Sequence, residues 1–168
     1  WIGGAEGTVI EDGAVVYRAG RVVWLGPRAD LPIGEPKAQL DARGGLIAPG
    51  LVNLHHHFYS ALARGMDPGQ PLRNFPEILQ GLWWLLDRAL DEETVRLSAQ
   101  LTLAESIRAG CTTIFDHHAS PAALAGSLDL IAEETLAAGL RAALCYEVSD
   151  RNGHSEALAG IAENERFA

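Results

Sequence analysis

The residues of this 168-residue sequence with the clearest chemical potential are three consecutive histidines, His55, His56 and His57. They end a short apolar run, 51–54, that follows a Pro-Gly turn. An apolar run this short between turn residues predicts a buried strand rather than a helix. Because successive side chains on a strand point to opposite faces, we expect His55 and His57 to face one way and His56 the other. Two imidazoles on one strand face can share one zinc-like metal ion.

Two histidines do not complete such a site, because a catalytic zinc usually has three protein ligands and a water. Further ligands must therefore come from elsewhere in the chain. The competing interpretations are strand-end histidines that bind no metal and a remnant of a purification tag. A tag remnant lies at a terminus beside linker residues, whereas this cluster is internal and follows an apolar run.

Composition and charge narrow the class of protein. A chain of 168 residues can bury one hydrophobic core, and 48% hydrophobic residues are ordinary for a globular protein. The formal net charge of −9, with no basic face to offset it, argues against a nucleic-acid or anionic-membrane partner. No apolar run approaches the length of a membrane span. The chain begins with Trp1 rather than Met, so we expect its natural start to lie upstream.

The two cysteines bear on the cellular compartment. Cys111 and Cys145 each lie in an apolar, strand-like run. This placement favours buried, reduced thiols and a cytoplasmic protein, with a disulfide between the two as the alternative.

The pattern of predicted elements changes near residue 49. Residues 1–48 favour antiparallel strands, with a hairpin across Glu11-Asp12-Gly13 and a further turn at Ala19-Gly20. From residue 49 on, strands alternate with helices, which is the rhythm of a parallel α/β sheet with right-handed crossovers. We expect strands at 51–54, 111–115 and 140–148, and helices at 77–90, 91–109, 120–139 and 155–168.

The amidohydrolase superfamily, a group of metal-dependent hydrolases on a TIM-type barrel, has a first-strand signature that resembles Pro49-Gly50-Leu51-Val52-Asn53-Leu54-His55-x-His57. Three further stretches, 57–65, 82–87 and 110–113, look like the aminohydrolase branch of that superfamily. This branch includes guanine, 8-oxoguanine and adenosine-type deaminases and triazine hydrolases. The stretches 116–121 and 150–152 are most similar to the SsnA-type aminohydrolases.

The resemblance implies the fold. Residues 1–48 would form part of a small β-sandwich, and residues 49–168 the first three β/α units of a (β/α)8 barrel. A closed eight-stranded barrel takes on the order of 250 residues, so the barrel in this chain is expected to be incomplete. We therefore expect the chain to be an N-terminal portion of a longer protein.

The resemblance also implies a mechanism. One divalent ion, zinc or iron, would be held by His55 and His57 together with a histidine and an aspartate from later strands. Such an ion lowers the pKa of water from near 16 to about 7, which supplies a nucleophile for an electron-poor ring or amide carbon. A general base beyond residue 168 would pass the proton to the leaving amine. The implied function is deamination of a small-molecule nitrogen heterocycle, a cyclic amidine or amide.

Two alternatives stay open. The first is a related hydrolase, either a ring-opening cyclic amidase or a chlorohydrolase. The second is a non-catalytic amidohydrolase-like protein that serves in assembly, although such a protein has no need for paired ligands on one strand face. Under each of these alternatives the protein could also form a homo-oligomer.

Catalysis in a TIM-type barrel takes place at the carboxyl ends of the strands. Asp116, His117 and His118 end the second predicted strand, so we expect them to face the same mouth as the ligand pair. His117 and His118 are candidates for substrate contact, and the competing interpretation is a pair of rim residues.

Trp84 could stack on a planar heterocycle, with core packing as the alternative. Ser60 stands where several relatives that act on purines or triazines carry a glutamine that touches the ring.

Overall fold

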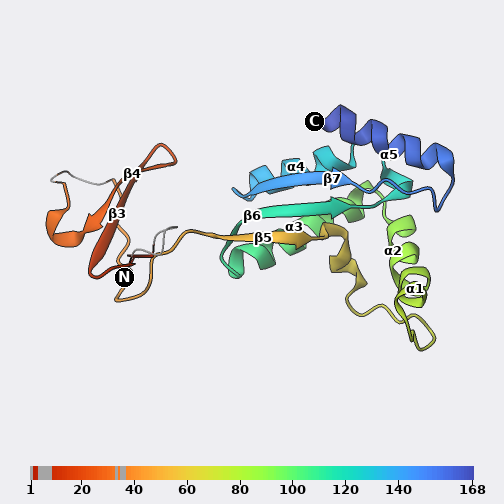
Figure 1. Ribbon diagram of the computed structural model, residues 1–168, viewed down its shortest axis with the longest axis horizontal. Coiled ribbons are helices and arrows are strands. Elements are labelled where there is room, and N and C mark those ends of the chain that lie inside the picture. Colours follow the sequence, from red (N-terminus) through yellow and green to blue (C-terminus); the bar gives the residue numbers. More distant parts are fainter. Residues whose placement is uncertain (1, 4–8, 33, 35–36) are drawn as a thin grey trace. The chain divides into compact units, whose positions relative to one another are not determined.

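The strand that ends in the histidines is one edge of a three-stranded parallel sheet (Figure 1). The computed structural model describes residues 2–3, 9–32, 34 and 37–168, and the sheet consists of β5 (Leu51–His56), β6 (Cys111–His118) and β7 (Arg141–Tyr146). The strand order is β5-β6-β7. The predicted parallel α/β arrangement is confirmed, and the carboxyl ends of all three strands lie at the same edge of the sheet.

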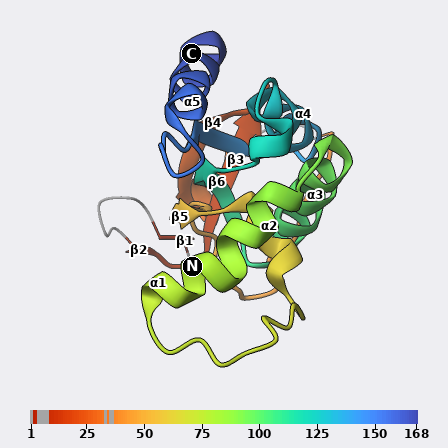
Figure 2. The same cartoon turned by 90° about the vertical axis from the view of Figure 1, so that its right-hand side faces the viewer.

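Helices connect and follow these strands. Their bounds are η2 (Phe58–Ala63), α1 (Phe75–Ile78), the π-helical segment η3 (Leu79–Trp83), α2 (Trp84–Ala89), α3 (Glu92–Arg108), η4 (Pro121–Ala123), α4 (Ser127–Ala137) and α5 (His154–Phe167). The helix expected over 77–90 begins at Phe75 and consists of α1, the π-helical segment η3 and α2 in succession. The three segments form one continuous helix (Figure 2). The helix expected over 120–139 begins only at Ser127, after Gly126 with its left-handed φ of 82°. None of the helices in the described ranges is long and apolar enough to cross a membrane.

The longest helix, α3, begins and ends where the sequence signals predict. The Asp91 side chain accepts a hydrogen bond from the Thr94 backbone N–H, and the Thr94 hydroxyl accepts one from the Asp91 N–H. This reciprocal cap satisfies two backbone donors in the first turn. The helix ends before Gly110, which has a φ of 79°. A residue in the left-handed region of φ and ψ cannot continue a right-handed helix.

Helices α3 and α4 pack on one face of the sheet (Figure 1). The buried core consists of Phe58, Leu86, Leu90, Val95, Ala99, Leu103, Ile114, Ile131 and Leu140. On the opposite face Val52, Leu54 and Phe115 are 53%, 73% and 44% exposed. Parallel sheets are usually covered on both faces, so this second face has the composition of a surface that is normally buried.

The chain divides into two compact units, Trp1–Pro49 and Gly50–Ala168. The parallel sheet and its helices lie in the second unit. The described part of the first unit contains β1 (Ile2–Gly3), β2 (Val9–Ile10), β3 (Gly13–Arg18), β4 (Arg21–Pro27) and the 3-10 turn η1 (Arg28–Asp30). The assignment of 1–48 to part of a small β-sandwich stays a prediction.

The predicted hairpin across 11–13 is wrong. Strand β2 pairs with β1, and β3 pairs with β4, so the strands on either side of this turn do not pair with each other. Thr8, at the start of the expected first strand, lies outside the described residues. The turn that closes β3 and β4 is Ala19-Gly20, with φ of 49° and 75°. Two left-handed residues match the twist of paired strands, which explains why this hairpin forms.

Both cysteines are free, so no disulfide joins them. The prediction that both are buried is wrong, because Cys111 is half-buried and Cys145 is exposed. Exposed and covered side chains alternate along β7, and Cys145 falls on the uncovered face of the sheet.

Candidate functional site at the strand tips

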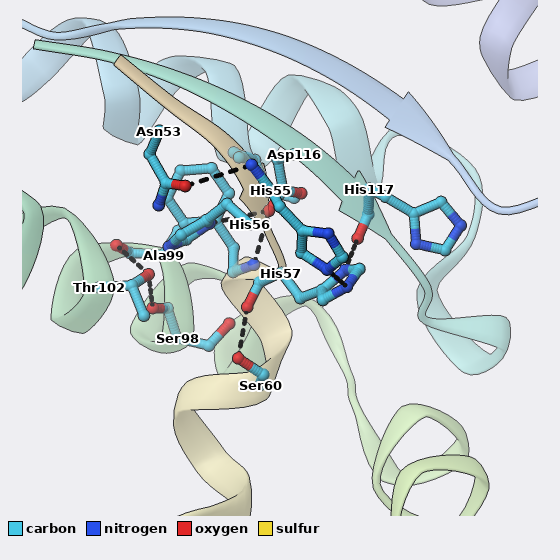
Figure 3. Close-up of polar contacts among 12 residues, drawn as sticks. Asn53, His55, His56, His57, Ser60, Ser98, Ala99, Thr102, Asp116 and His117 are labelled. Carbon is cyan, nitrogen blue, oxygen red and sulfur yellow. Dashed lines mark hydrogen bonds and ion pairs between the residues drawn. The ribbon is translucent and has the colours of Figure 1, made fainter. Parts of the chain in front are cut away.

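His55 and His57 lie side by side at the tip of β5, as strand alternation predicts (Figure 3). Their Nε2 atoms are 3.1 Å apart, and their rings meet edge to face. His56, between them, instead contacts Asp116. The pair therefore presents two ring nitrogens to one point in space.

A β-bulge shapes this strand end. Asn53 pairs with Ile114 and His56 with Asp116, so β5 has one residue more than β6 in this interval. Leu54 and His55 are both exposed within it. Bulges are frequent beside functional sites because they re-aim a side chain, and the side chain concerned here is His55.

The hydrogen bond of His57 Nδ1 leaves a lone pair on Nε2, which contacts Nε2 of His55 and can bind a metal ion. Its Nδ1–H donates to the backbone carbonyl of His117 at 2.9 Å (Figure 3). Since a carbonyl only accepts, the proton of neutral His57 is on Nδ1, and Nε2 carries a lone pair. A hydrogen bond of this kind commonly supports a metal-binding imidazole, because it fixes both the ring and its tautomer.

Asp116 fixes the backbone directly after the pair. Its Oδ1 accepts hydrogen bonds from the Phe58 N–H at 2.7 Å and from the Nδ1–H of His56 at 3.0 Å. The Asp116 carboxyl group is fully covered and does not open into the mouth as predicted, although Asp116 borders the hollow beside the pair. Burial alternates along the end of β6, so Asp116 and His118 turn to the helix side while His117 turns to the other.

The geometry of the pair fits a zinc-like ion. Two nitrogen ligands of a tetrahedral zinc are about 3.3 Å apart, given Zn–N bonds of about 2.0–2.1 Å. The Nε2 atoms of His55 and His57, at 3.1 Å, are close to this spacing. Within the described residues, no three His, Cys, Asp or Glu side chains are grouped to hold one ion. The pair is thus part of a ligand set rather than a whole one.

An open hollow of about 410 Å³ lies beside the pair. It is lined by Leu54, His55, His56, His57, Phe115, Asp116, His117, Ala143, Leu144 and Cys145. The His117 ring lies 5.3 Å from the His57 ring. Burial lowers the pKa of His117, although the nearby Glu147 carboxylate opposes this effect. Of the four residues predicted to contact substrate, His117 is the one that lines the hollow.

His118 does not reach the hollow, which corrects the prediction that it contacts substrate. It is fully buried, and its Nε2–H donates to the Ser120 hydroxyl at 2.8 Å. Burial lowers the pKa of His118 to about 3, so the ring is neutral at neutral pH. His118 is therefore a structural residue of the core.

Ser60 and Trp84 have partners outside the hollow. The Ser60 hydroxyl donates to the His57 carbonyl at 2.7 Å. The Trp84 ring lies under the guanidinium of Arg151, with 5.7 Å between Cζ and the ring centroid. Substrate contact by either residue stays a prediction.

A charged cluster near the strand tips is not predicted by any local sequence pattern. Arg151, in the loop after β7, forms ion pairs with Asp87 of α2 at 2.5 Å and with Glu147. Burial raises the pKa of Asp87, and the Arg151 charge opposes this shift. Because Asp87 and Arg151 are 64 residues apart, only the tertiary fold brings them together. The stretch 150–152 supported the family resemblance but indicated no role for Arg151.

Comparison with known proteins gives the family. The profile of the amidohydrolase family matches residues 46–168, which include the histidine pair and all three strands of the parallel sheet. The chain belongs to the amidohydrolase family. The family resemblance of the first-strand segment is thereby confirmed, and a curated deaminase among the relatives supports the aminohydrolase branch.

Individual relatives of this amidohydrolase-family chain are longer proteins. The 8-oxoguanine deaminase of Pseudomonas aeruginosa is 36% identical over 135 residues, which are 79% of this chain and 29% of the deaminase. The structure of E. coli guanine deaminase matches with a TM-score of 0.72 at 22% identity, over 94% of this chain and 36% of that one. A mutant of atrazine chlorohydrolase from Arthrobacter aurescens TC1, complexed with zinc and atraton, matches with a TM-score of 0.62 at 20% identity, over 86% and 33%. The chain spans about a third of the length of these proteins, and the two structures show a likeness of fold alone.

Proposed function

We propose that the protein that carries this chain is a metal-dependent aminohydrolase, which releases ammonia from a nitrogen heterocycle with a cyclic amidine or amide group. The observation that carries the proposal is the pair of Nε2 atoms of His55 and His57, which face each other at a strand tip. Membership of the amidohydrolase family and the similarity to an 8-oxoguanine deaminase support this reaction class. The proposed partner is a small-molecule substrate.

The proposed cofactor is a divalent ion, zinc or iron, held by His55 and His57 with further ligands from outside the described residues. When bound, such an ion supplies Lewis acidity that makes water nucleophilic at neutral pH. The chain's own residues orient the ligands. The His117 carbonyl holds the His57 ring, and Asp116 holds the backbone at Phe58. The His117 ring stands beside the pair, where it can contact a bound heterocycle.

We also propose that the parallel sheet is the first part of a TIM-type barrel. Two features support this architecture: the repeated strand-helix order and the apolar, uncovered face of the sheet. The likeness of fold to E. coli guanine deaminase supports it as well. Closure of such a barrel would cover Val52, Leu54 and Phe115 and complete the mouth around the histidine pair. A cytoplasmic location and a homo-oligomer stay predictions.

Ammonia release tests the proposed function. The zinc-loaded protein is incubated with amino-substituted purines, pyrimidines, pterins and triazines, and ammonia is measured with a coupled enzyme. We expect release from at least one compound, its loss after treatment with a chelator, and its return when zinc is added back. Absence of ammonia from every compound, or release that persists without metal, would contradict the proposal. Chloride release or ring opening without ammonia would indicate the related hydrolases instead.

A further inference from the structure

A buried charge cluster lies beside the strand tips and has no part in the reaction proposed so far. The Arg151 guanidinium bridges the carboxyl groups of Asp87, at 2.5 Å, and Glu147, and it covers the ring of Trp84. The side chains of Asp87, Arg151 and Glu147 are 2%, 12% and 27% exposed. The cluster joins helix α2 to the loop after β7.

The Glu147 end of this cluster lies at the mouth. The Glu147 backbone N–H donates to the His118 carbonyl at 2.8 Å, so Glu147 extends the ladder between the tips of β6 and β7. His117 pairs with Cys145 in the register of β6 and β7, and both residues line the hollow. Because side chains alternate along an extended chain, Glu147 lies on the same face of the sheet as Cys145. Within the described residues, Arg151 pairs with Oε2 of Glu147, and Oε1 has no hydrogen-bond partner.

Stability alone does not account for this cluster. Taking charges out of water costs free energy, and a buried ion pair is often no more stable than apolar packing. Asp87 Oδ1 and Arg151 Nε are buried without a hydrogen-bond partner among the described residues, which adds to that cost. Arg96 provides a contrast, because it pairs with Glu133 and Glu134 at 2.7 and 2.8 Å on more exposed helix faces. The costly position of the Arg151 cluster, next to the mouth, points to a role in the site.

We propose that Glu147 is a specificity-determining residue of the strand-tip site and that Arg151 is the residue that positions it. Glu147 Oε1 accepts a hydrogen bond from an amino or ring N–H group of the substrate, while Arg151 fixes Oε2. The two carboxylates of Asp87 and Glu147 and the one guanidinium of Arg151 carry a net negative charge, which disfavours binding of an anionic substrate beside them. The substrate class is therefore a neutral or cationic amino-heterocycle, not a carboxylate or a phosphate ester. This inference rests on the proposed function of the histidine pair.

Ligand binding by variants tests the assignment. The zinc-loaded protein is titrated by calorimetry with 8-oxoguanine, guanine and the amino-triazine ammeline, and the tightest-bound compound is used for the variants. In Glu147→Gln the amide oxygen faces Arg151, which leaves an NH2 group toward the substrate N–H. We expect Glu147→Gln and Arg151→Met to raise Kd about tenfold or more, the scale of one charge-assisted hydrogen bond. Arg151→Lys recovers part of this loss, because it keeps the positive charge.

Two controls separate this role from a merely structural one. Zinc content should be unchanged in the Glu147 and Arg151 variants, and Arg96→Met, which removes an arginine that also bridges two carboxylates, should leave Kd unchanged. If Arg151→Met fails to fold, Glu147→Gln and Arg151→Lys decide the question.

The outcomes distinguish this inference from the proposed function. A Kd that is the same in wild type, Glu147→Gln and Arg151→Met overturns the assignment, whether or not ammonia is released. A wild-type protein that binds none of the three compounds overturns it too. Binding that depends on Glu147 without ammonia release supports the assignment and removes the deaminase function.

Discussion

The histidines at the strand tips differ in the partners of their ring nitrogens. Nδ1–H of His57 donates to a backbone carbonyl and that of His56 to Asp116, whereas the exposed His55 ring faces His57 through Nε2. His118 is enclosed in the core. Partners and exposure, rather than the number of histidines, separate the two candidate ligands from the structural imidazoles.

Asp116→Ala tests whether a buried carboxylate supports the tip of β5. The change leaves the Phe58 N–H and the His56 ring without their acceptor, and an unsatisfied buried donor costs about 1–3 kcal/mol. We expect the free energy of unfolding to fall by about 2 kcal/mol or more in urea titrations. Asp129→Ala, at a half-exposed ion pair with Arg166, should change it by less than about 0.5 kcal/mol. Equal effects of the two substitutions would contradict this role of Asp116.

His118 should make stability depend on pH. Its folded-state pKa of about 3 is below the ordinary value of 6.5, so the unfolded chain binds a proton that the folded chain does not. The stability contributed by the neutral ring is fully present above pH 6.5 and is lost as pH falls toward 3, by about 1.4 kcal/mol per pH unit. Urea titrations between pH 4 and pH 8 should show a shallower dependence for His118→Asn than for wild type. Identical slopes would show that His118 does not titrate on unfolding.

At the level of elements, helix α5 approaches the end of β7 through a glycine. A Cβ on Gly160 would lie 2.8 Å from the Glu147 carbonyl oxygen and 3.4 Å from the Tyr146 ring. Glycine is therefore required by the close approach of two backbones.

Gly160→Ala measures this approach. Alanine gains about 1 kcal/mol of helix propensity over glycine, whereas overpacking against a rigid backbone costs about 1–3 kcal/mol. We expect a net loss of about 1 kcal/mol in the free energy of unfolding, measured by urea titration. Gly81→Ala is the matched control, because its Cβ would meet only the flexible end of Leu72, so no loss is expected there. A gain in stability for Gly160→Ala would contradict the tight packing of α5 on β7.

Local rules explain which elements could be predicted. The bounds of α3, predicted at 91–109 and found at Glu92–Arg108, and the alternation of strands with helices depend on neighbours in sequence, and both agree with the structure. The bulge between Asn53 and His56 arises from the register against β6, which no pattern within β5 encodes. The turn at Ala19-Gly20, which joins β3 to β4, could be predicted from local sequence, whereas the pairing of β2 with β1 is encoded by no local pattern.

At the level of the whole molecule, the site combines near and distant residues. The spacing of His55 and His57 was sufficient to predict that their rings meet, because strand alternation is a local rule. The direction of the Asp116 carboxyl group could not be predicted from a run of polar residues after an apolar run, because β6 continues through His118 and its side chains alternate between the two faces. The pairing of Asp87 with Arg151 could not be predicted, since it depends on how α2 packs beside β7.

The metal content of the purified protein tests the central claim most directly. Wild-type protein and the variants His55→Ala, His57→Ala and His56→Gln are prepared under identical conditions, and bound zinc and iron are measured by mass spectrometry. We expect about one ion per chain in wild type and in His56→Gln, which keeps a donor toward Asp116, and a loss of most of it in the two alanine variants. Equal metal content in all four proteins, or none in wild type supplied with zinc, would contradict the assignment of His55 and His57 as ligands.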